Sequence, residues 1–261
     1  MKGAQIKVTS KDGTTISCRG SGTGPPLVLV HGMAGSSARW TPILPGLGRH
    51  YAVYAMDRRG RGDSGDADSY AIEREYEDVA AVLDALGEPA SLLGHSFGGL
   101  CALEGARLTR NIRKLVLYEP LEIGGTSPVG GIERLEVLLD AGDREGVLAT
   151  FMSDFIGMPQ NEIEQIRASP AWPARLAAAH TLPRELLAEA RYEFDPGRFS
   201  DLQIPTLLLT GGDSPHFFRA GVEVLDAALP ECRIVVMPGQ QHVADQMAPD
   251  LFVREVLAFL K

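Results

Sequence analysis

The chain carries a serine in the pattern G-x-S-x-G, at Gly94-His95-Ser96-Phe97-Gly98. A short apolar run at 90–93 precedes it, and residues 100–108 after it have the composition of a helix. A serine on a sharp turn between a strand and a helix has its hydroxyl exposed, in a strained backbone conformation. Glycines suit the flanking positions, where a side chain would collide with the crossing backbone. The pattern therefore predicts Ser96 as a nucleophile.

Such a serine needs a base that takes its proton and an acid that orients the base. His242 is the candidate base, since it lies in a loop at 238–242 after the last predicted strand, where the sites of open α/β sheets collect. Asp213 and Glu119 are the candidate acids, and each follows an apolar run. The chain order of serine, acid and histidine leads us to prefer Asp213, with Glu119 as the alternative. Asp213 also fits a helix N-cap.

A backbone oxyanion hole is the third requirement of acyl transfer. The segment His31-Gly32-Met33 follows the apolar run at 27–30. A backbone N–H in such a loop acts together with the N–H of the residue after the nucleophile. The candidate donors are therefore the backbone N–H groups of Met33 and Phe97.

The elements that must position these residues alternate along the chain. Residues 6–9 and 14–18 have period-two patterns around the turn Lys11-Asp12-Gly13, which predicts a hairpin. Further strands are expected at 27–30, 52–56, 90–93, 115–118, 206–209 and 233–236, and helices at 72–86, 100–108, 217–228 and 250–260. This alternation predicts an α/β fold, a mostly parallel sheet flanked by helices.

The region from about 121 to 200 breaks the alternation, because it contains no strong strand pattern. Helical segments are expected at 132–140, 143–156 and 183–192, with prolines between them. Since the region is inserted between two strands of the sheet, we predict that it forms a helical cap. The chain then divides into a core at 1–120 and 201–261 and a cap at 121–200.

Together, the segments 31–32, 57–64 and 94–99 with Asp213 and His242 resemble the α/β-hydrolase family, over nearly the whole chain. The resemblance implies an eight-stranded, mostly parallel sheet with a helical cap after the sixth strand, and it implies no cofactor. Carried over residue by residue, it implies Ser96 as nucleophile, His242 as general base and acid, and Asp213 as the group that orients His242.

Composition limits the classes of function. The 261 residues are 44% hydrophobic and 23% charged, as in a globular protein with a core. A formal net charge of −9 gives no general attraction to nucleic acid or anionic lipid. No run has the length of a membrane span, and no long apolar segment follows the N-terminal lysine, which argues against a signal peptide. Cys18, Cys101 and Cys232 are far apart and support neither a metal site nor a disulfide framework, so we expect a reducing cytoplasm.

Arg58, Arg59 and Arg61 form a local basic cluster, and Arg61-Gly62-Asp63 matches the integrin-recognition tripeptide. In a chain of net charge −9 the cluster is weak evidence for nucleic acid. In the family that the chain resembles, the matching loop is structural. We therefore expect a small-molecule substrate and no nucleic-acid or membrane partner. The oligomeric state stays open between monomer and dimer.

The predicted reaction is acyl transfer to water through an acyl-enzyme on Ser96. Because ligand pockets are mostly apolar, we expect a small to medium, mostly neutral ester or lactone, bound between the sheet and the cap. Candidate wall residues are His31, Trp40, His95, Phe151, Phe155 and Trp172. A buried position in the core would explain the aromatic ones equally well.

Three alternatives stay open. The same triad serves C–C bond hydrolysis, lyase or perhydrolase chemistry in members of the family, and turnover of p-nitrophenyl esters and lactones separates these from an esterase. An intact triad also occurs in ligand receptors, which bind tightly and turn over very slowly. A third alternative is that the cap binds a protein partner, of which an exposed apolar patch would be the sign.

Overall fold

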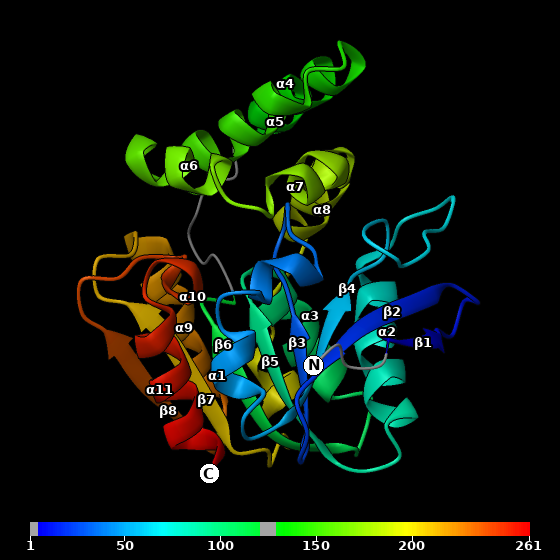
Figure 1. Cartoon of the computed structure of the whole chain (residues 1–261), viewed down its shortest axis with the longest axis vertical. Coiled ribbons are helices and arrows are strands. Elements are labelled where there is room, and N and C mark those ends of the chain that lie inside the picture. Colours follow the sequence, from blue (N-terminus) through cyan, green and yellow to red (C-terminus); the bar gives the residue numbers. More distant parts are fainter. Residues whose placement is uncertain (1–4, 121–128) are drawn as a thin grey trace.

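The computed structural model describes residues 5–120 and 129–261. An eight-stranded sheet forms its centre, in the order β1-β2-β4-β3-β5-β6-β7-β8 (Figure 1). The strands are β1 (Gln5–Thr9), β2 (Thr15–Ser21), β3 (Pro26–Val30), β4 (Ala52–Asp57), β5 (Ala90–His95), β6 (Ile112–Tyr118), β7 (Thr206–Gly211) and β8 (Cys232–Met237). β1 and β2 form the predicted hairpin, β2 is antiparallel to β4, and the other neighbours are parallel. The predicted fold class is confirmed.

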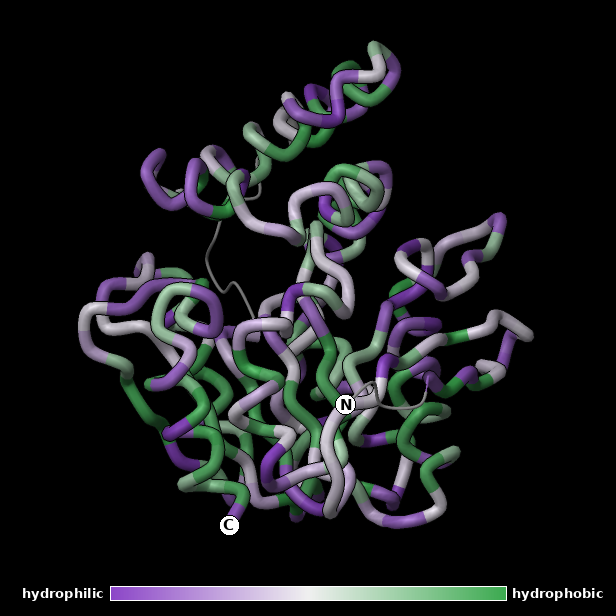
Figure 2. Tube along the Cα trace, viewed as in Figure 1, coloured by the Kyte–Doolittle hydropathy of each residue, from purple (hydrophilic) through white to green (hydrophobic). Residues whose placement is uncertain are grey.

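Side chains of the central strands alternate between two hydrophobic cores, one on each face of the sheet. Val28 and Val30 of β3 lie in the first core, whereas Leu27 and Leu29 of the same strand lie in the second. A strand that is buried on both faces has a continuous apolar sequence, which is why 27–30 could be recognised. Figure 2 shows the apolar strands inside more polar outer elements.

Helices cover both faces of the sheet. α2 (Ile72–Ala85), α3 (Phe97–Ala106) and α9 (His216–Ala228) pack on the first core, and α11 (Pro249–Leu260) packs on the second. The short helices η1 (Ser37–Trp40), α1 (Leu44–Leu47) and α10 (Ala244–Met247) complete the described core helices. Each long helix overlaps its predicted range, and α3 begins directly after Ser96.

The helical insertion between β6 and β7 forms the predicted cap over the sheet (Figure 1). Its helices are α4 (Val129–Asp140), α5 (Arg144–Thr150), the π-helix η2 (Phe151–Phe155), α6 (Gln160–Arg167), α7 (Trp172–Ala178), η3 (Ala179–Thr181), α8 (Leu182–Ala190) and η4 (Pro196–Phe199). The three expected helical segments correspond to α4, to α5 with η2, and to α8, whereas α6 and α7 are additional. The start of the predicted cap, 121–128, lies outside the described residues.

A buried ionic cluster joins the core to the cap. Arg58 donates to Glu75 of α2 at 2.8 and 3.0 Å and to Glu185 of α8 at 2.8 Å, and Arg61 also donates to Glu185. Arg59 is buried as well and pairs with α2. The basic cluster seen in the sequence is therefore turned inward, in agreement with a structural loop, and presents no exposed arginine patch.

Candidate active site

Ser96 lies on the turn between β5 and α3 with φ 54° and ψ −135°, a backbone conformation that residues other than glycine rarely adopt. Glycines permit this turn because the chain crosses itself closely. A Cβ on Gly94 would lie 2.6 Å from the carbonyl oxygen of Gly98, and one on Gly98 would meet the carbonyl oxygen of His31. Such strain persists only where the surrounding structure enforces it. The turn presents the serine at the carboxyl end of β5.

His242 lies in the loop after β8, and its carboxylate partner is Glu119. Nδ1 of His242 is 2.6 Å from Oε2 of Glu119, and both side chains are buried. Oε1 of Glu119 accepts from the hydroxyl of Thr210 at 2.9 Å and from the N–H of Gly211 at 2.8 Å. With Nδ1–H donating to the carboxylate, Nε2 is the basic nitrogen. Glu119, the alternative acid of the sequence analysis, therefore occupies the position expected for Asp213.

The topology of the sheet explains why Glu119, and not the preferred candidate Asp213, contacts His242. Asp213 is exposed and lies in the loop beyond the end of β7, whereas Glu119 comes directly after β6. β6 and β7 are neighbours in the sheet, so the Glu119 side chain extends across the end of β7 to the loop that carries His242. Both acids satisfy the order of serine, acid and histidine, and the order therefore cannot separate them.

Hydrogen bonds set the charge of Glu119. Burial alone would raise its pKa, but the bond and the attraction from His242, together with the N–H of Gly211, hold the pKa of this carboxyl below its ordinary value. The carboxylate is therefore ionised at neutral pH. Its backbone has φ 44°, in the left-handed region. A strained residue held at both carboxylate oxygens is a firmly positioned partner for the imidazole.

Neighbouring rings hold the imidazole of His242 in place. Phe218 of α9 stacks on it with centroids 3.9 Å apart and planes 9° apart, and the centroid of His95 lies at 4.5 Å. Nε2 of His95 is 2.8 Å from the carbonyl oxygen of His242, and burial lowers the pKa of His95 well below its ordinary value. His95 is thus a neutral donor that fixes this loop.

Ser96 and His242 line one cavity, so the nucleophile and the base candidate lie in the same site. Within the described residues no hydrogen bond joins Ser96 Oγ to His242. Such bonds are often long or poorly aligned in a free enzyme and tighten when substrate binds.

The N–H groups of Met33 and Phe97 are the candidate oxyanion donors. Phe97 is the first residue of α3, so its N–H has no acceptor within the helix. Val30 of β3 pairs with Gly94 of β5, which brings the loop that contains Met33 beside the turn at Ser96. Neither N–H donates to an acceptor in residues 5–120 or 129–261. Both are available to a developing negative charge.

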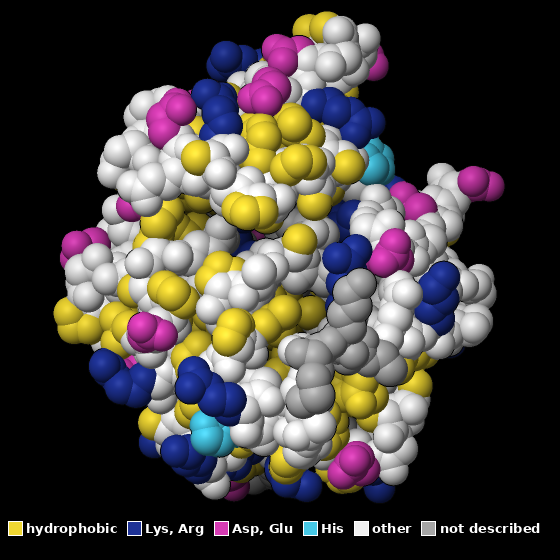
Figure 3. Space-filling view, viewed as in Figure 1, with side chains coloured by type: hydrophobic (Ala, Val, Ile, Leu, Met, Phe, Trp, Pro, Cys, Tyr) yellow, Lys and Arg dark blue, Asp and Glu magenta, His cyan; other side chains and the backbone are white. Residues whose placement is uncertain are grey.

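Two small cavities, of about 30 and 10 Å³, lie beside Ser96 and share Met33, Phe151 and Ile156 in their walls. The larger is also lined by Arg39, His95, Met152, Met158, Ile166, Arg175, His242 and Val243, and the smaller by Glu119, Pro120, Phe155, Leu186, Glu189 and Phe218. Most of the wall is apolar, and much of it comes from the cap. Figure 3 shows hydrophobic side chains on the cap and a hollow between cap and core.

The predicted wall residues divide into two groups. His95, Phe151 and Phe155 line the cavities, whereas His31, Trp40 and Trp172 do not. Trp40 is buried in the second core, Trp172 donates to Glu145 within the cap at 3.0 Å, and His31 accepts from the N–H of Arg58 at 3.2 Å. These three side chains are occupied by contacts with other elements, which leaves them away from the cavity.

Arg39 and Arg175 line the larger of these two cavities, and neither was a candidate from the sequence. Arg39 belongs to η1 in the core, and Arg175 belongs to α7 in the cap. No local pattern distinguishes them, because an arginine in an alanine-rich helix has the pattern of an exposed position. The packing of the cap on the core brings the two together.

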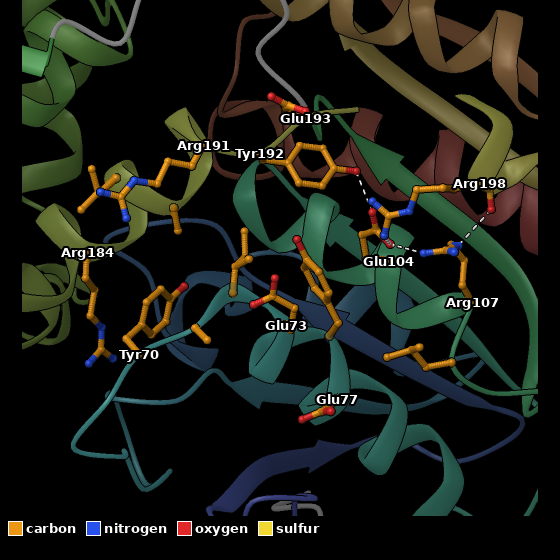
Figure 4. Close-up of a pocket in the computed structure, with 16 residues that line it drawn as sticks. Tyr70, Glu73, Glu77, Glu104, Arg107, Arg184, Arg191, Tyr192, Glu193 and Arg198 are labelled. Carbon is orange, nitrogen blue, oxygen red and sulfur yellow. Dashed lines mark hydrogen bonds and ion pairs between the residues drawn. The ribbon is translucent and has the colours of Figure 1, made fainter. Parts of the chain in front are cut away.

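A much larger cavity, of about 670 Å³, lies between α2, α3 and α8 (Figure 4). Part of its polar lining is joined by hydrogen bonds: Glu104 accepts from Tyr192 at 2.7 Å, from Arg107 at 2.6 Å and from Arg198 at 2.9 Å. None of the candidate catalytic residues lines it. Its size therefore does not make it the catalytic site.

Residues 27–255 match the model of the alpha/beta hydrolase family. The chain belongs to the alpha/beta hydrolase family. This hydrolase is similar to a crystallised alpha/beta hydrolase from Sphaerobacter thermophilus, with 36% identity, a TM-score of 0.86 and coverage of 98% of this chain and 100% of that one. It is also similar to a crystallised esterase from Rhodococcus sp. ECU1013, with 28% identity, a TM-score of 0.78 and coverage of 98% of both chains.

A curated relative extends the comparison to a protein of known activity. The pimeloyl-[acyl-carrier protein] methyl ester esterase of Aeromonas hydrophila is 30% identical over 94% of this hydrolase and 99% of its own length. The chain is thus an enzyme of a family whose members here include carboxylic ester hydrolases. In the part of the chain that the structure describes, no helix is long and apolar enough to cross a membrane.

Proposed function

We propose that this hydrolase cleaves a small to medium carboxylic ester or lactone through an acyl-enzyme on Ser96. The observation that carries the proposal is the buried pair of His242 and Glu119, 2.6 Å apart, in the walls of the two cavities that share Ser96. A nucleophile beside a base that a third group orients is the arrangement of nucleophilic catalysis.

The reaction follows from the roles of these groups. His242 Nε2 takes the proton of Ser96 as Oγ attacks the carbonyl carbon, and Glu119 stabilises the imidazolium that forms. The N–H groups of Met33 and Phe97 stabilise the oxyanion. His242 then gives its proton to the leaving oxygen, which leaves Ser96 acylated. Water, activated by His242, releases the acid and restores the serine.

Two observations support an ester or lactone as the substrate class. Most of the residues that line the two cavities are apolar, as is usual for small organic ligands. The similar proteins include a methyl ester esterase and a second esterase. The fold by itself does not determine the substrate.

A fluorophosphonate probe, followed by mass spectrometry of the labelled peptide, tests the nucleophile. We expect modification at Ser96 and no labelling of Ser96→Ala protein that retains its circular dichroism spectrum. An unlabelled Ser96 would contradict the mechanism. The substrate class is tested separately with short p-nitrophenyl esters and simple lactones, and turnover of neither would contradict it.

A further inference from the structure

Arg175 is a buried cation of the cap that has no carboxylate partner among the described residues. Arg175 is 4% exposed and lines the cavity that contains Ser96 and His242. Nη1 donates to the carbonyl oxygen of Ala34 at 3.1 Å, Nη2 donates to the side-chain amide oxygen of Gln246 at 3.4 Å, and Nε has no hydrogen-bond partner. Arginines are almost never fully buried unless they are paired with an acid. This position therefore requires an explanation.

The neighbouring arginine, Arg39, does have a carboxylate partner. Arg39 lines the same cavity and donates to Asp245 at 2.6 Å, with both side chains buried, so these two charges cancel. Burial and the charge of Arg39 lower the pKa of Arg175 to about 9, which still leaves Arg175 charged at neutral pH. Among the residues that the structure describes, one positive charge in this part of the site is not compensated.

The other titratable side chains that line the cavities in residues 5–120 and 129–261 do not supply the missing negative charge. His95 in the same wall is neutral. Glu119 is hydrogen-bonded to His242, and it lines the smaller cavity together with Glu189 of α8. The cavity of about 30 Å³ is therefore electropositive at Arg175. Glu119 and Glu189 line the cavity of about 10 Å³ instead.

We propose that Arg175, with Arg39 beside it, binds a carboxylate of the substrate, so that the ester or lactone carries one negative charge. The inference rests on the proposed function, because it places that carboxylate near an acyl group held at Ser96. A guanidinium presents its N–H groups in a planar fork that matches a carboxylate. The sequence led us to expect a mostly neutral ester or lactone. The proposal replaces this expectation with an ester or lactone that is apolar apart from a single carboxylate.

Physical chemistry favours this ligand over a neutral one. An isolated charge in a dry cavity is unfavourable, because it has lost its water without gaining a partner. A bound carboxylate supplies the partner, and the attraction is stronger there than in water because the effective dielectric constant is lower. A phosphate monoester would bring nearly two negative charges and overcompensate the one that is free.

A purely structural role for Arg175 is the competing explanation. Arg175 bonds the carbonyl oxygen of Ala34, whose φ of 49° lies in the left-handed region and which directly follows Met33. On that explanation Arg175 attaches the cap to the loop that contains Met33 and Ala34. Loss of Arg175 would then slow the hydrolysis of charged and neutral esters by the same factor. The two explanations differ in the ratio of rates for charged and neutral esters, and not in the absolute rates.

Two matched substrate pairs measure this ratio. Mono-4-nitrophenyl glutarate against 4-nitrophenyl pentanoate places the carboxylate on the acyl side, and 4-carboxyphenyl acetate against phenyl acetate places it on the alcohol side. Spontaneous hydrolysis is subtracted in each case. We expect wild-type enzyme to prefer the charged member of at least one pair in kcat/KM. We expect Arg175→Met to reduce that preference by about 30-fold or more, the lower range for losing one partner of a buried charged pair.

Arg134→Met is the matched control, because Arg134 is an exposed arginine on α4 of the cap. It should leave the preference unchanged. Equilibrium binding of the same esters to Ser96→Ala protein, measured by calorimetry, gives a second readout that needs no turnover. Tighter binding of the charged ester, lost in the Ser96→Ala, Arg175→Met double variant, supports the inference even if the proposed chemistry fails.

Three outcomes would overturn the inference. The first is that neither charged ester is preferred, in rate by the wild-type enzyme or in binding. This outcome does not depend on whether the Arg175→Met protein folds. The second is an equal loss for charged and neutral esters in Arg175→Met, which would assign Arg175 to holding the oxyanion loop. The third is a preference that survives in Arg175→Met. Turnover of the neutral esters alone would leave the proposed function standing while this inference fell.

Discussion

At the scale of single residues, the position of one carboxylate determines how the site can work. Glu119 bonds Nδ1 of His242, and its second oxygen is held by Thr210 and Gly211 at the end of β7. Asp213 is exposed to solvent beyond the same strand. We therefore propose the orienting role for Glu119, and this proposal has consequences for activity and for stability.

Glu119→Gln tests the role in activity. Glutamine keeps the size of the side chain but cannot stabilise the imidazolium or select its tautomer, so kcat should fall by about 10³–10⁴. Asp213→Asn should remain close to wild type in the same ester assay, with both variants checked for folding by circular dichroism. A large loss in Asp213→Asn and none in Glu119→Gln would reverse the assignment.

The lowered pKa of Glu119 also leads us to predict how the stability of the protein depends on pH. Its pKa is below the ordinary value of 4.5 in the folded protein, so the unfolded chain takes up the proton first as the pH falls. The stabilisation is complete above the unfolded pKa and is lost as the pH falls through the folded pKa. The free energy of unfolding of wild type should therefore fall more steeply below about pH 4.5 than that of Glu119→Gln. Chemical denaturation between pH 3 and pH 6 measures both slopes, and parallel slopes would contradict the prediction.

At the scale of elements, the site is assembled from loops at the carboxyl ends of β3, β5, β6 and β8, and it is covered by the cap. The cap is joined to the core through Glu185 of α8, which accepts from Arg58 and Arg61 in the loop after β4. All three side chains are buried. Breaking a buried ionic contact leaves an unpaired charge, which costs far more than losing an exposed pair.

Glu185→Gln should therefore lower the free energy of unfolding by about 3–5 kcal/mol. Glu164→Gln is the matched control on α6, where Glu164 forms an exposed pair with Arg167, and it should cost less than about 1 kcal/mol. Urea denaturation of the two variants measures the difference. Equal values for both would show that the buried cluster does not stabilise the junction of cap and core.

At the scale of the whole molecule, the cap and the first face of the core share one hydrophobic cluster. Leu148 and Phe151 of the cap belong to the same cluster as Leu100 of α3 and Val28 of β3. A continuous core together with the buried ionic cluster favours cooperative unfolding. The two tryptophans report on separate parts of this unit, since Trp40 is buried in the core and Trp172 is buried in the cap.

Thermal unfolding of Trp172→Phe, followed by Trp40 fluorescence, should coincide with the far-ultraviolet circular dichroism of the same variant. The same agreement should hold for Trp40→Phe, followed by Trp172. Because each variant serves as its own reference, a change in stability caused by the substitution does not affect the comparison. An earlier transition for Trp172 alone would show that the cap unfolds independently.

Much of the fold could be predicted because its signals are local. The apolar run at 27–30 marks a strand buried on both faces, and Gly87 ends α2 with φ 74°. The helices α6 and α7 were less visible, since they are short and bordered by prolines. In the site, His242 was located by its place after the last strand, whereas Trp40 and Trp172 were candidates by type alone and proved to be packing residues.

The sequence by itself determined the turn at Ser96, because the steric demands of a tight turn act within a few residues and select Gly94 and Gly98. It also determined the alternation that places a cap between β6 and β7. The tertiary structure decided which acid meets His242, because that depends on β6 lying beside β7 and on where each strand ends. It also decided that Arg175 of the cap lines the same cavity as Ser96, because the packing of the cap on the core buries a charge whose local sequence indicates an exposed residue.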